Sequence, residues 1–131
     1  PSINTIVDIC NLVSIRYALP VSALDSRAIS VPVTVRFAKG NEVFYNLGQS
    51  EGENPAEGEV IFIDETAVVL ARRWCWRQSA ESAAREDTSQ VVITVEAQND
   101  GGRELVKSAL ADLEMLLTEY TGGEFSSQIL P

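Results

Sequence analysis

Apolar residues recur at helical spacing near both ends of the chain. From residue 3 to 17 they predict an amphipathic helix that is N-capped by Ser2 and ended by Pro20. From residue 103 to 120 they predict a second amphipathic helix, stopped by Gly122 and Gly123. The apolar positions of the two helices are Ile6, Ile9, Cys10, Val13 and Tyr17, and Val106, Ala109, Leu110, Leu113, Leu116, Leu117 and Tyr120.

Between these helices the apolar period changes to two, which is typical of strands. Residues 31–37 and 42–47 flank the turn residues Lys39-Gly40-Asn41, so they predict a β-hairpin. Further strands are predicted at 59–64, 67–76 and 89–97, with a short helix at 78–84. The segment 49–59, which carries four glutamates with Gly and Pro and no basic residue, is interpreted as a solvated loop.

This order of elements predicts an α+β fold with a mixed or antiparallel sheet of about five or more strands. The helices at the N- and C-terminal ends are expected to pack on that sheet. The 131 residues suit a single domain, 1–131, with one core. The chain begins at Pro1 rather than Met, so we expect an excised domain, a proteolytic core or a processed product, with upstream residues missing.

The charge balance argues against electrostatic capture of nucleic acid. Nineteen acidic residues against ten basic ones give a net charge of −9 and a pI near 4.4, whereas a phosphate backbone is gripped by many Lys and Arg. Any nucleic-acid contact must therefore use a local patch. The sequence shows neither a long apolar span nor a secretory signal, so we expect a soluble cytoplasmic protein with no membrane partner.

The side chains available for catalysis are restricted because the chain contains no His. Every Ser-His-Asp or Cys-His mechanism is excluded. Cys10 and Cys75 are expected to be small buried residues, with a disulfide as the alternative, and no metal is expected. The glycine-rich and metal-binding motifs of nucleotide enzymes and hydrolases do not occur, so no cofactor is expected.

The stretch RRWCWRQS, residues 72–79, concentrates three arginines and both tryptophans in this acidic chain. On a continuous strand Arg72, Trp74 and Trp76 would share one face, and Arg73, Cys75 and Arg77 the other. Two interpretations stay open for each group. The tryptophans fill the core or stack on a flat ligand, and the arginines pair with the chain's own carboxylates or bind phosphate.

Glu96 ends the apolar run VVITVEA and shares a strand face with Val92 and Thr94. It lies either at the wet end of the strand or in a pocket, where it would be a functional candidate. Asp8, Asn11 and Ser14 follow one another on the polar side of the first predicted helix. By themselves they indicate a solvated helix face.

Several segments, in this order, resemble the tRNA-binding and editing domain of the phenylalanyl-tRNA synthetase beta subunit. That domain consists of the paired third and fourth modules, and the resemblance is strongest to its freestanding relatives. The segments cover about residues 3 to 98, and the final helix also suits the freestanding type. They are TIVDICNLVSIRYALPVSALD (5–25), VTVRFAKGNEVFYNLG (33–48), GEVIFIDE (58–65), RRWCWRQS and VVITVEA.

In that family the domain is a proofreading site that removes tyrosine wrongly attached to the phenylalanine tRNA. The resemblance places Asp8–Asn11 on the family's Asp-Val-Thr-Asn stretch and Pro20–Asp25 on its Pro-Leu-His-Ala-Phe-Asp stretch. Glu96 falls on the carboxylate that recognises the tyrosine hydroxyl. Cys10 stands where the family has Thr, Ser22 where it has His, and RRWCWRQS replaces its glycine-rich pocket segment.

These correspondences imply one function and leave another open. In the first, the chain recognises the acceptor end of aminoacyl-tRNA and hydrolyses a mischarged ester in trans. Asn11, Ser22 and Ser79 would be catalytic, Glu96, Cys10, Trp74 and Trp76 would bind substrate, and Arg72, Arg73 and Arg77 would hold RNA phosphates. In the second, the chain is a non-catalytic module for an amino acid, RNA or a protein partner. A complete ligase does not fit in 131 residues.

Overall fold

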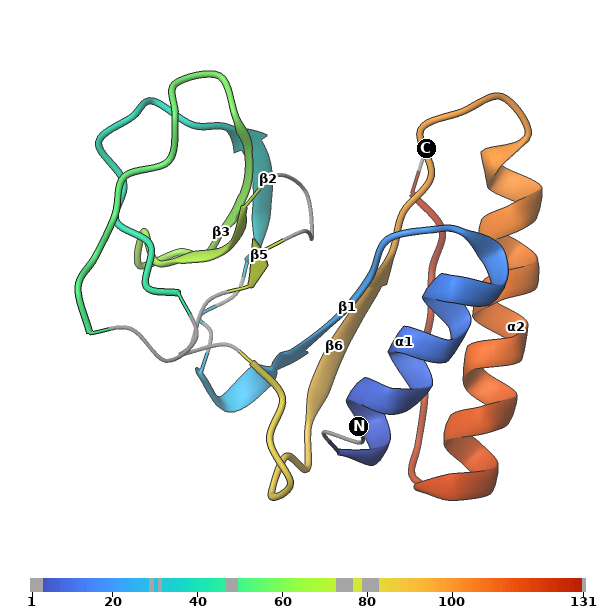
Figure 1. The fold of residues 1–131 in the computed structure, drawn as a ribbon. Coiled ribbons are helices and arrows are strands. Elements are labelled where there is room, and N and C mark those ends of the chain that lie inside the picture. Colours follow the sequence, from blue (N-terminus) through green and yellow to red (C-terminus); the bar gives the residue numbers. More distant parts are fainter. Residues whose placement is uncertain are drawn as a thin grey trace. The chain divides into compact units, whose positions relative to one another are not determined.

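The computed structural model describes residues 4–28, 30, 32–46, 50–72, 77–78 and 83–130. Along the chain, one α-helix precedes the strands and a second α-helix follows them (Figure 1). The elements are α1 (Thr5–Tyr17), β1 (Val21–Asp25), the 3-10 helix η1 (Ser26–Ala28), β2 (Thr34–Phe37), β3 (Val60–Ile63), β4 (Val69–Arg72), β5 (Arg77–Gln78), β6 (Val91–Val95) and α2 (Gly102–Tyr120).

The strands form two sheets, and the predicted α+β class with a helix at each end is confirmed. β1 pairs with β6, and the other sheet has the order β2-β3-β4-β5 with antiparallel neighbours. The chain divides into two compact units, Pro1–Ala23 with Ile93–Pro131, and Leu24–Val92. Strands β1 and β6 each contribute residues to both units.

The first unit is built on the two predicted helices. The side chain of Asn4, rather than the predicted Ser2, caps α1 by accepting from the Val7 N–H at 2.9 Å, and Ser2 lies outside the described residues. Ala18 ends α1 in the left-handed conformation, with φ 53°. Arg16 forms an ion pair with Asp112 of α2, and the Tyr17 O–H donates to the same carboxylate at 3.3 Å.

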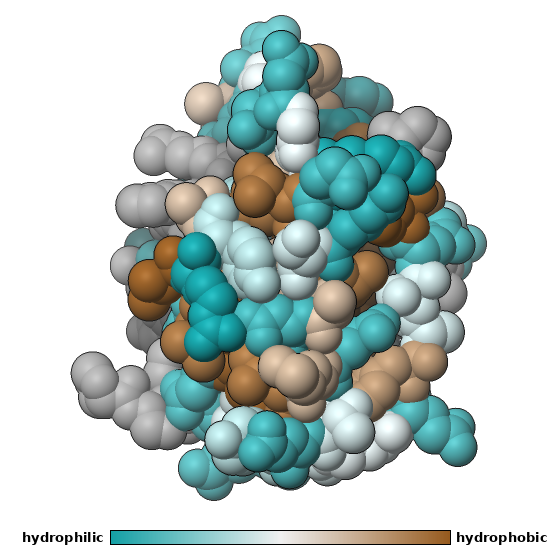
Figure 2. All heavy atoms as spheres, turned by 90° about the vertical axis from the view of Figure 1, so that its right-hand side faces the viewer, coloured by the Kyte–Doolittle hydropathy of each residue, from teal (hydrophilic) through white to brown (hydrophobic). Residues whose placement is uncertain are grey.

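Helix α2 buries Ala109, Leu113 and Leu117, which recur every four residues as the pattern predicts. Its opposite side, including Met115, is exposed, and Tyr120, which was predicted among the apolar positions, is exposed as well. Figure 2 shows the face seen from the right-hand side of Figure 1, where hydrophobic residues form separate patches between hydrophilic ones.

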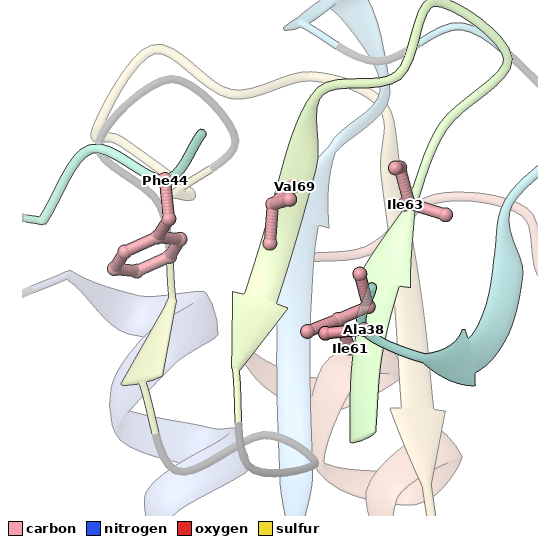
Figure 3. Packing of buried hydrophobic residues seen from close by; sticks show 5 residues of the cluster. All are labelled: Ala38, Phe44, Ile61, Ile63 and Val69. Atoms are coloured by element: carbon pink, nitrogen blue, oxygen red, sulfur yellow. The ribbon is translucent and has the colours of Figure 1, made fainter. Parts of the chain in front are cut away.

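The predicted hairpin between residues 31–37 and 42–47 is wrong, because β2 pairs with β3 instead. Thr34 lies opposite Ile63 and Phe37 opposite Val60. Residues 42–46 form no named strand, although Phe44 makes an isolated bridge to Glu53. Phe44 is fully buried in a cluster, and its burial draws this segment into the core. The cluster comprises Ala38, Phe44, Ile61, Ile63 and Val69 (Figure 3).

Other strand predictions are partly right. The predicted strand at 89–97 is confirmed as β6, and that at 67–76 is confirmed for 69–72. Arg72 and Arg77 are cross-strand partners in β4 and β5, so they do not belong to one continuous strand. The predicted helix at 78–84 is wrong at both ends, since Gln78 is in β5 and Ala83 bridges to Leu24.

Strand β1 was not predicted. Its residues Ser22–Asp25 are all buried, so the strand lacks the alternation by which a half-buried strand is recognised.

Candidate functional site

Strands β1 and β6 bring two hydroxyls and a carboxylate together. The Ser26 N–H donates to the Gln90 carbonyl at 3.0 Å, and the Glu96 N–H donates to the Pro20 carbonyl at 3.1 Å. These bonds define an antiparallel register in which Ser22 lies opposite Thr94.

The side chains of Ser22, Thr94 and Glu96 form a chain of polar contacts, which we call the hydroxyl–carboxylate array. The hydroxyl oxygens of Ser22 and Thr94 are 2.9 Å apart, and Thr94 Oγ1 donates to Glu96 Oε1 at 3.4 Å. Thr94 and Glu96 share a strand face because they are two residues apart. Ser22 is 5% exposed, whereas Thr94 and Glu96 are partly buried. All three residues belong to the first unit.

The Glu96 carboxylate is the hydrogen-bond acceptor of the array. An ionised carboxylate accepts hydrogen bonds and donates none, so Glu96 suits a ligand hydroxyl or ammonium group. The sequence predicted Glu96 and Ser22 but assigned no role to Thr94. Its position on the Glu96 face was visible in the alternation, whereas its contact with Ser22 depends on the unpredicted strand β1.

Cys10 and Asn11 lie on α1 in different environments. Cys10 is a free cysteine with 3% exposure, and burial raises the pKa of its thiol to about 12. It is therefore a neutral packed side chain at pH 7, as expected of a buried cysteine, and not a nucleophile. Asn11 is exposed.

Much of the RRWCWRQS stretch lies outside the described residues. This applies to Arg73, Trp74, Cys75, Trp76 and Ser79, for which the predictions stay predictions. Arg77 is described through its backbone in β5, opposite Arg72.

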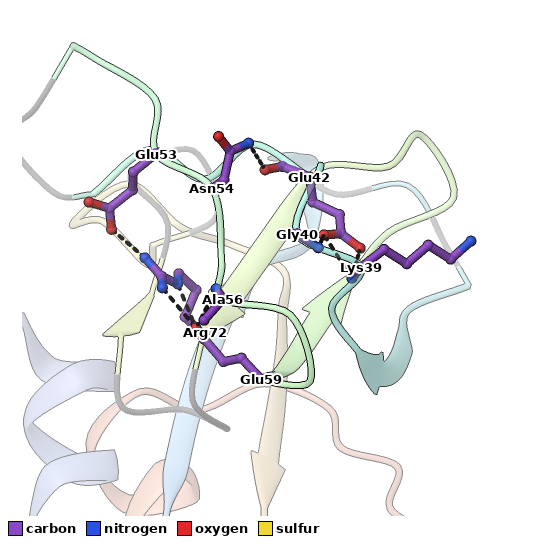
Figure 4. A network of polar contacts seen from close by, with 8 residues as sticks. All are labelled: Lys39, Gly40, Glu42, Glu53, Asn54, Ala56, Glu59 and Arg72. Atoms are coloured by element: carbon purple, nitrogen blue, oxygen red, sulfur yellow. Dashed lines mark hydrogen bonds and ion pairs between the residues drawn. The ribbon is translucent and has the colours of Figure 1, made fainter.

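Arg72 occupies an internal network of ion pairs (Figure 4). Its Nε and Nη2 donate to the two carboxylate oxygens of Glu59, each at 2.8 Å, and Nη1 donates to Glu53 Oε1. The guanidinium also lies over the Phe44 ring, 5.5 Å from its centroid. Its side chain is 6% exposed. Of the two interpretations of the arginines, pairing with the chain's own carboxylates describes Arg72.

The interpretation of segment 49–59 as a solvated loop holds for most of its described residues, which are exposed, but the network corrects it for Pro55 and Glu59. Glu59 has a side chain that is 7% exposed, and Pro55 is fully buried. Asn54 also ties the segment down by donating to the Glu42 carbonyl at 2.7 Å. Segment 49–59 contains no basic residue of its own. Its glutamates Glu53 and Glu59 pair instead with Arg72 of β4, which lies further along the chain.

Two further buried carboxylates hold the backbone of the second unit. Asp25 accepts from Arg27 and from the Thr88 hydroxyl, and the Arg27 hydrogen bond is the main reason why its pKa is well below the usual range. Burial raises the pKa of Asp64, but hydrogen bonds from Ser30, Thr66 and Val68 outweigh it and lower the pKa overall. Because these carboxylates bond to nearby turns and loops, we assign them a structural role.

Within the described part of the chain, no group of three or more His, Cys, Asp or Glu residues is placed to hold a metal ion. No helix among the described residues is long and apolar enough to cross a membrane.

Comparisons with known proteins agree with the suspected domain. The family model of the B3/4 domain matches residues 1–122. Among solved structures, the chain is similar to an N-terminal fragment of the phenylalanyl-tRNA synthetase beta-subunit from Pyrococcus horikoshii, with a TM-score of 0.73 and 18% identity. The match covers 87% of this chain and 39% of that fragment, so the chain spans less than half of it. No curated protein sequence matches. The resemblance inferred from the sequence is confirmed, and the chain belongs to the B3/4 domain family.

Proposed function

We propose that this chain recognises the acceptor end of an aminoacyl-tRNA and reads the attached amino acid with Glu96. The observation that supports this function best is the hydroxyl–carboxylate array, which backs a partly buried carboxylate with Thr94 and Ser22. Membership of the B3/4 family and the likeness to a phenylalanyl-tRNA synthetase fragment support the choice of ligand class.

A carboxylate in such a setting discriminates strongly between ligands. A site built to pair a ligand hydroxyl leaves its own polar group unsatisfied when the hydroxyl is missing, which costs on the order of 10⁴-fold in favourable cases. Glu96 would therefore favour a hydroxylated side chain such as tyrosine over phenylalanine.

Hydrolysis of a mischarged ester in trans is the activity that we assign to this site. Without His, the reaction must use a positioned water, with amide and hydroxyl groups stabilising the developing oxyanion. Asn11 is exposed on α1 and is available for this role, and Ser79 is proposed for it on sequence grounds. Arg73 and Arg77 are the proposed contacts to RNA phosphates, since Arg72 is committed to Glu53 and Glu59.

A non-catalytic binding module is the second candidate function. It is favoured by the state of two of the predicted site residues. Ser22 is buried and hydrogen-bonded to Thr94, and the Cys10 thiol is neutral at pH 7. Neither side chain is exposed to a substrate, as its predicted role in hydrolysis would require.

Deacylation of a panel of charged tRNAs tests the proposal, beginning with tyrosine and phenylalanine on the phenylalanine tRNA. The chain, Glu96→Gln and the exposed control Glu119→Gln are compared. We expect release of tyrosine in preference to phenylalanine, lost in Glu96→Gln and retained in the control. If no ester in the panel is hydrolysed by folded protein but charged tRNA binds with this preference, the non-catalytic module is correct. If charged tRNA does not bind either, recognition of aminoacyl-tRNA is refuted, and only a non-catalytic module for an amino acid or a protein partner is left.

A further inference from the structure

We propose that the bond between Asp100 and Gly101 is a site of spontaneous modification, at which Asp100 rearranges to isoaspartate through a cyclic imide. This inference does not depend on the proposed function. Asp100 and Gly101 lie in the loop that joins β6 to α2 (Figure 1). They form the one Asp-Gly pair in the sequence, which contains no Asn-Gly pair.

The rearrangement needs no reactant other than water. The amide nitrogen of the residue after the aspartate attacks the carbon of the side-chain carboxylic acid. A C–N bond forms, the C–O bond breaks, and the acid's hydroxyl leaves with the amide proton as water. Water then opens the ring at one of its two carbonyls. Opening at the side-chain carbonyl restores aspartate, whereas opening at the main-chain carbonyl leaves isoaspartate, with one extra methylene in the main chain.

Glycine is the residue that hinders this attack least, because it has no side chain beside the attacking nitrogen. At Gly101 the surroundings are open as well. A Cβ placed there would meet no atom within 4 Å, so the loop has room for the ring. Sequence and structure therefore agree that ring closure is sterically free at this bond.

The structure also sets Asp100 apart from the other five aspartates by the state of the following N–H group. After each of those five, this N–H is hydrogen-bonded, within a helix in two cases and to a backbone carbonyl of another segment or turn in three. The helical aspartates are Asp8 and Asp112, and the other three bonds run from Ser26 to Gln90 at 3.0 Å, from Glu65 to Ser30 at 3.0 Å and from Thr88 to Arg85 at 3.1 Å. In the described part of the chain, nothing accepts from the Gly101 N–H.

The Asp100 carboxyl group is accessible too. Asp100 and Gly101 are both exposed, and no described residue donates to this carboxyl group. Ring closure requires rotation about the Cα–C bond of Asp100. One turn hydrogen bond across this pair opposes the rotation, from the Gly102 N–H to the Asn99 carbonyl at 2.9 Å. An exposed turn of this kind opens at little cost in free energy.

Asp25 provides a comparison within the same chain. It also precedes a small residue, Ser26, but its carboxylate is buried and accepts hydrogen bonds from Arg27 and Thr88. The Ser26 N–H is engaged as well, by the Gln90 carbonyl. Both reactive groups are held apart by other partners, so the folded chain should protect this bond.

Isoaspartate at residue 100 would loosen the start of α2. The extra methylene falls inside the turn that the bond from Gly102 to Asn99 closes. Gly102 has no free space on the side of Ala97, so the longer turn is not easily accommodated. We therefore expect modified chains to unfold at a lower urea concentration than unmodified ones.

Peptide mapping of aged protein tests the inference. The chain, Asp100→Glu and Asp87→Glu are incubated at neutral pH, both folded and in urea. Isoaspartate is located by electron-transfer fragmentation and by methylation with a protein isoaspartyl methyltransferase. A synthetic peptide of residues 97–104 gives the rate without the fold. Glutamate at residue 100 would need a larger, slowly formed ring, and Asp87→Glu changes another exposed aspartate as the matched control.

We expect isoaspartate at residue 100 of the folded chain at a rate within about tenfold of the rate in the peptide. Asp100→Glu should lose this signal, and Asp87→Glu should keep it. At Asp25, the reaction should be at least about 100-fold slower in the folded chain than in urea, where its hydrogen bonds are broken.

Three results would overturn the inference. If the peptide accumulates isoaspartate and the folded chain does not, the loop protects the bond. Equal rates at Asp25 and Asp100 in the folded chain would show that the hydrogen bonding of the N–H and carboxyl groups does not select the site. Isoaspartate that arises only from Asn99, recognised by the change in mass on loss of its amide, would place the reaction at the wrong residue.

Discussion

Arg72, which the sequence singled out as a candidate for binding phosphate, forms ion pairs inside the protein. It had two candidate partners, an external phosphate and the chain's own carboxylates, and the structure pairs it with Glu53 and Glu59. A buried charge of this kind is tolerable because its partners surround it. The concentration of arginine in an acidic chain is therefore explained in part by internal pairing.

Removing the Arg72 charge should destabilise the protein strongly. Arg72→Met leaves Glu59 buried without its guanidinium partner, so we expect a loss of about 3–5 kcal/mol in the free energy of unfolding. Urea denaturation measures it. Arg103→Met, at an exposed position of α2, is the control and should change stability by less than about 0.5 kcal/mol. A loss of similar size in both variants would contradict the structural role of the network.

Glu42 should make the free energy of unfolding depend on pH in the acidic range. Burial raises its pKa, but hydrogen bonds from the Lys39 and Gly40 N–H groups and from Arg36 outweigh burial and lower the pKa from 4.5 to about 2. Between pH 4.5 and about 2, Glu42 therefore binds more protons in the unfolded chain than in the folded one. The stabilisation is present above pH 4.5 and is lost as the pH falls towards 2.

Glu42→Gln should remove this dependence. We expect the variant to be less stable than the native chain at pH 7 by about 1–3 kcal/mol. The difference should narrow between pH 4.5 and 2, as measured by urea denaturation at several pH values. Glu51→Gln, at an exposed position, is the control and should show the same stability as the native chain at each pH. If the difference between Glu42→Gln and the native chain does not change with pH, Glu42 does not account for the acid sensitivity.

At the scale of elements, the helices were predicted well and the strand pairing was not. The 3.6-residue period is a local property, and both amphipathic helices appear within two residues of their predicted ends. Strand pairing is a choice among distant segments. β2 pairs with β3, while residues 42–46 form no named strand and Phe44 of that segment lies in the core cluster.

The start of α2 depends on the absence of a side chain at Gly102. A Cβ at this position would lie 2.7 Å from the Ala97 Cβ, which is closer than non-bonded carbon atoms approach one another in proteins. Gly102→Ala should therefore destabilise the protein by about 1–3 kcal/mol, although Ala is the better helix former. Thermal or urea unfolding measures the loss.

Two further variants distinguish crowding from helix propensity at this position. Ser108→Ala, on the exposed face of α2, should be neutral or stabilising. In an Ala97→Gly background, Gly102→Ala should cost clearly less, because the crowding atom is gone. An undiminished cost in that background would rule out the proposed clash.

At the scale of the whole molecule, net charge limits the proposed binding of RNA. With a net charge of −9, and with Arg72 engaged internally, few cations are left to neutralise phosphates. We expect uncharged tRNA to bind weakly. The slope of log Kobs against log salt should have a magnitude below about 3. Fluorescence anisotropy of labelled tRNA across a KCl series measures it. A much steeper slope would show a phosphate-gripping surface.

What the sequence determined by itself is the local and compositional part of the protein. The two helices, the strand β6, the α+β class, the absence of His chemistry and the position of Glu96 at the end of an apolar strand follow from residue periods and residue types. The ordered segments also identified the domain, which the B3/4 match confirms.

Only the tertiary structure decided which distant residues meet. β1 was hidden by its continuous burial, and with it the contact of Ser22 with Thr94, 72 positions away. The partner of Arg72 was equally unpredictable, since Glu59 and Glu53 lie in a segment whose composition resembles a solvated loop. Such pairings depend on strand register and core packing across the chain, which no local period encodes.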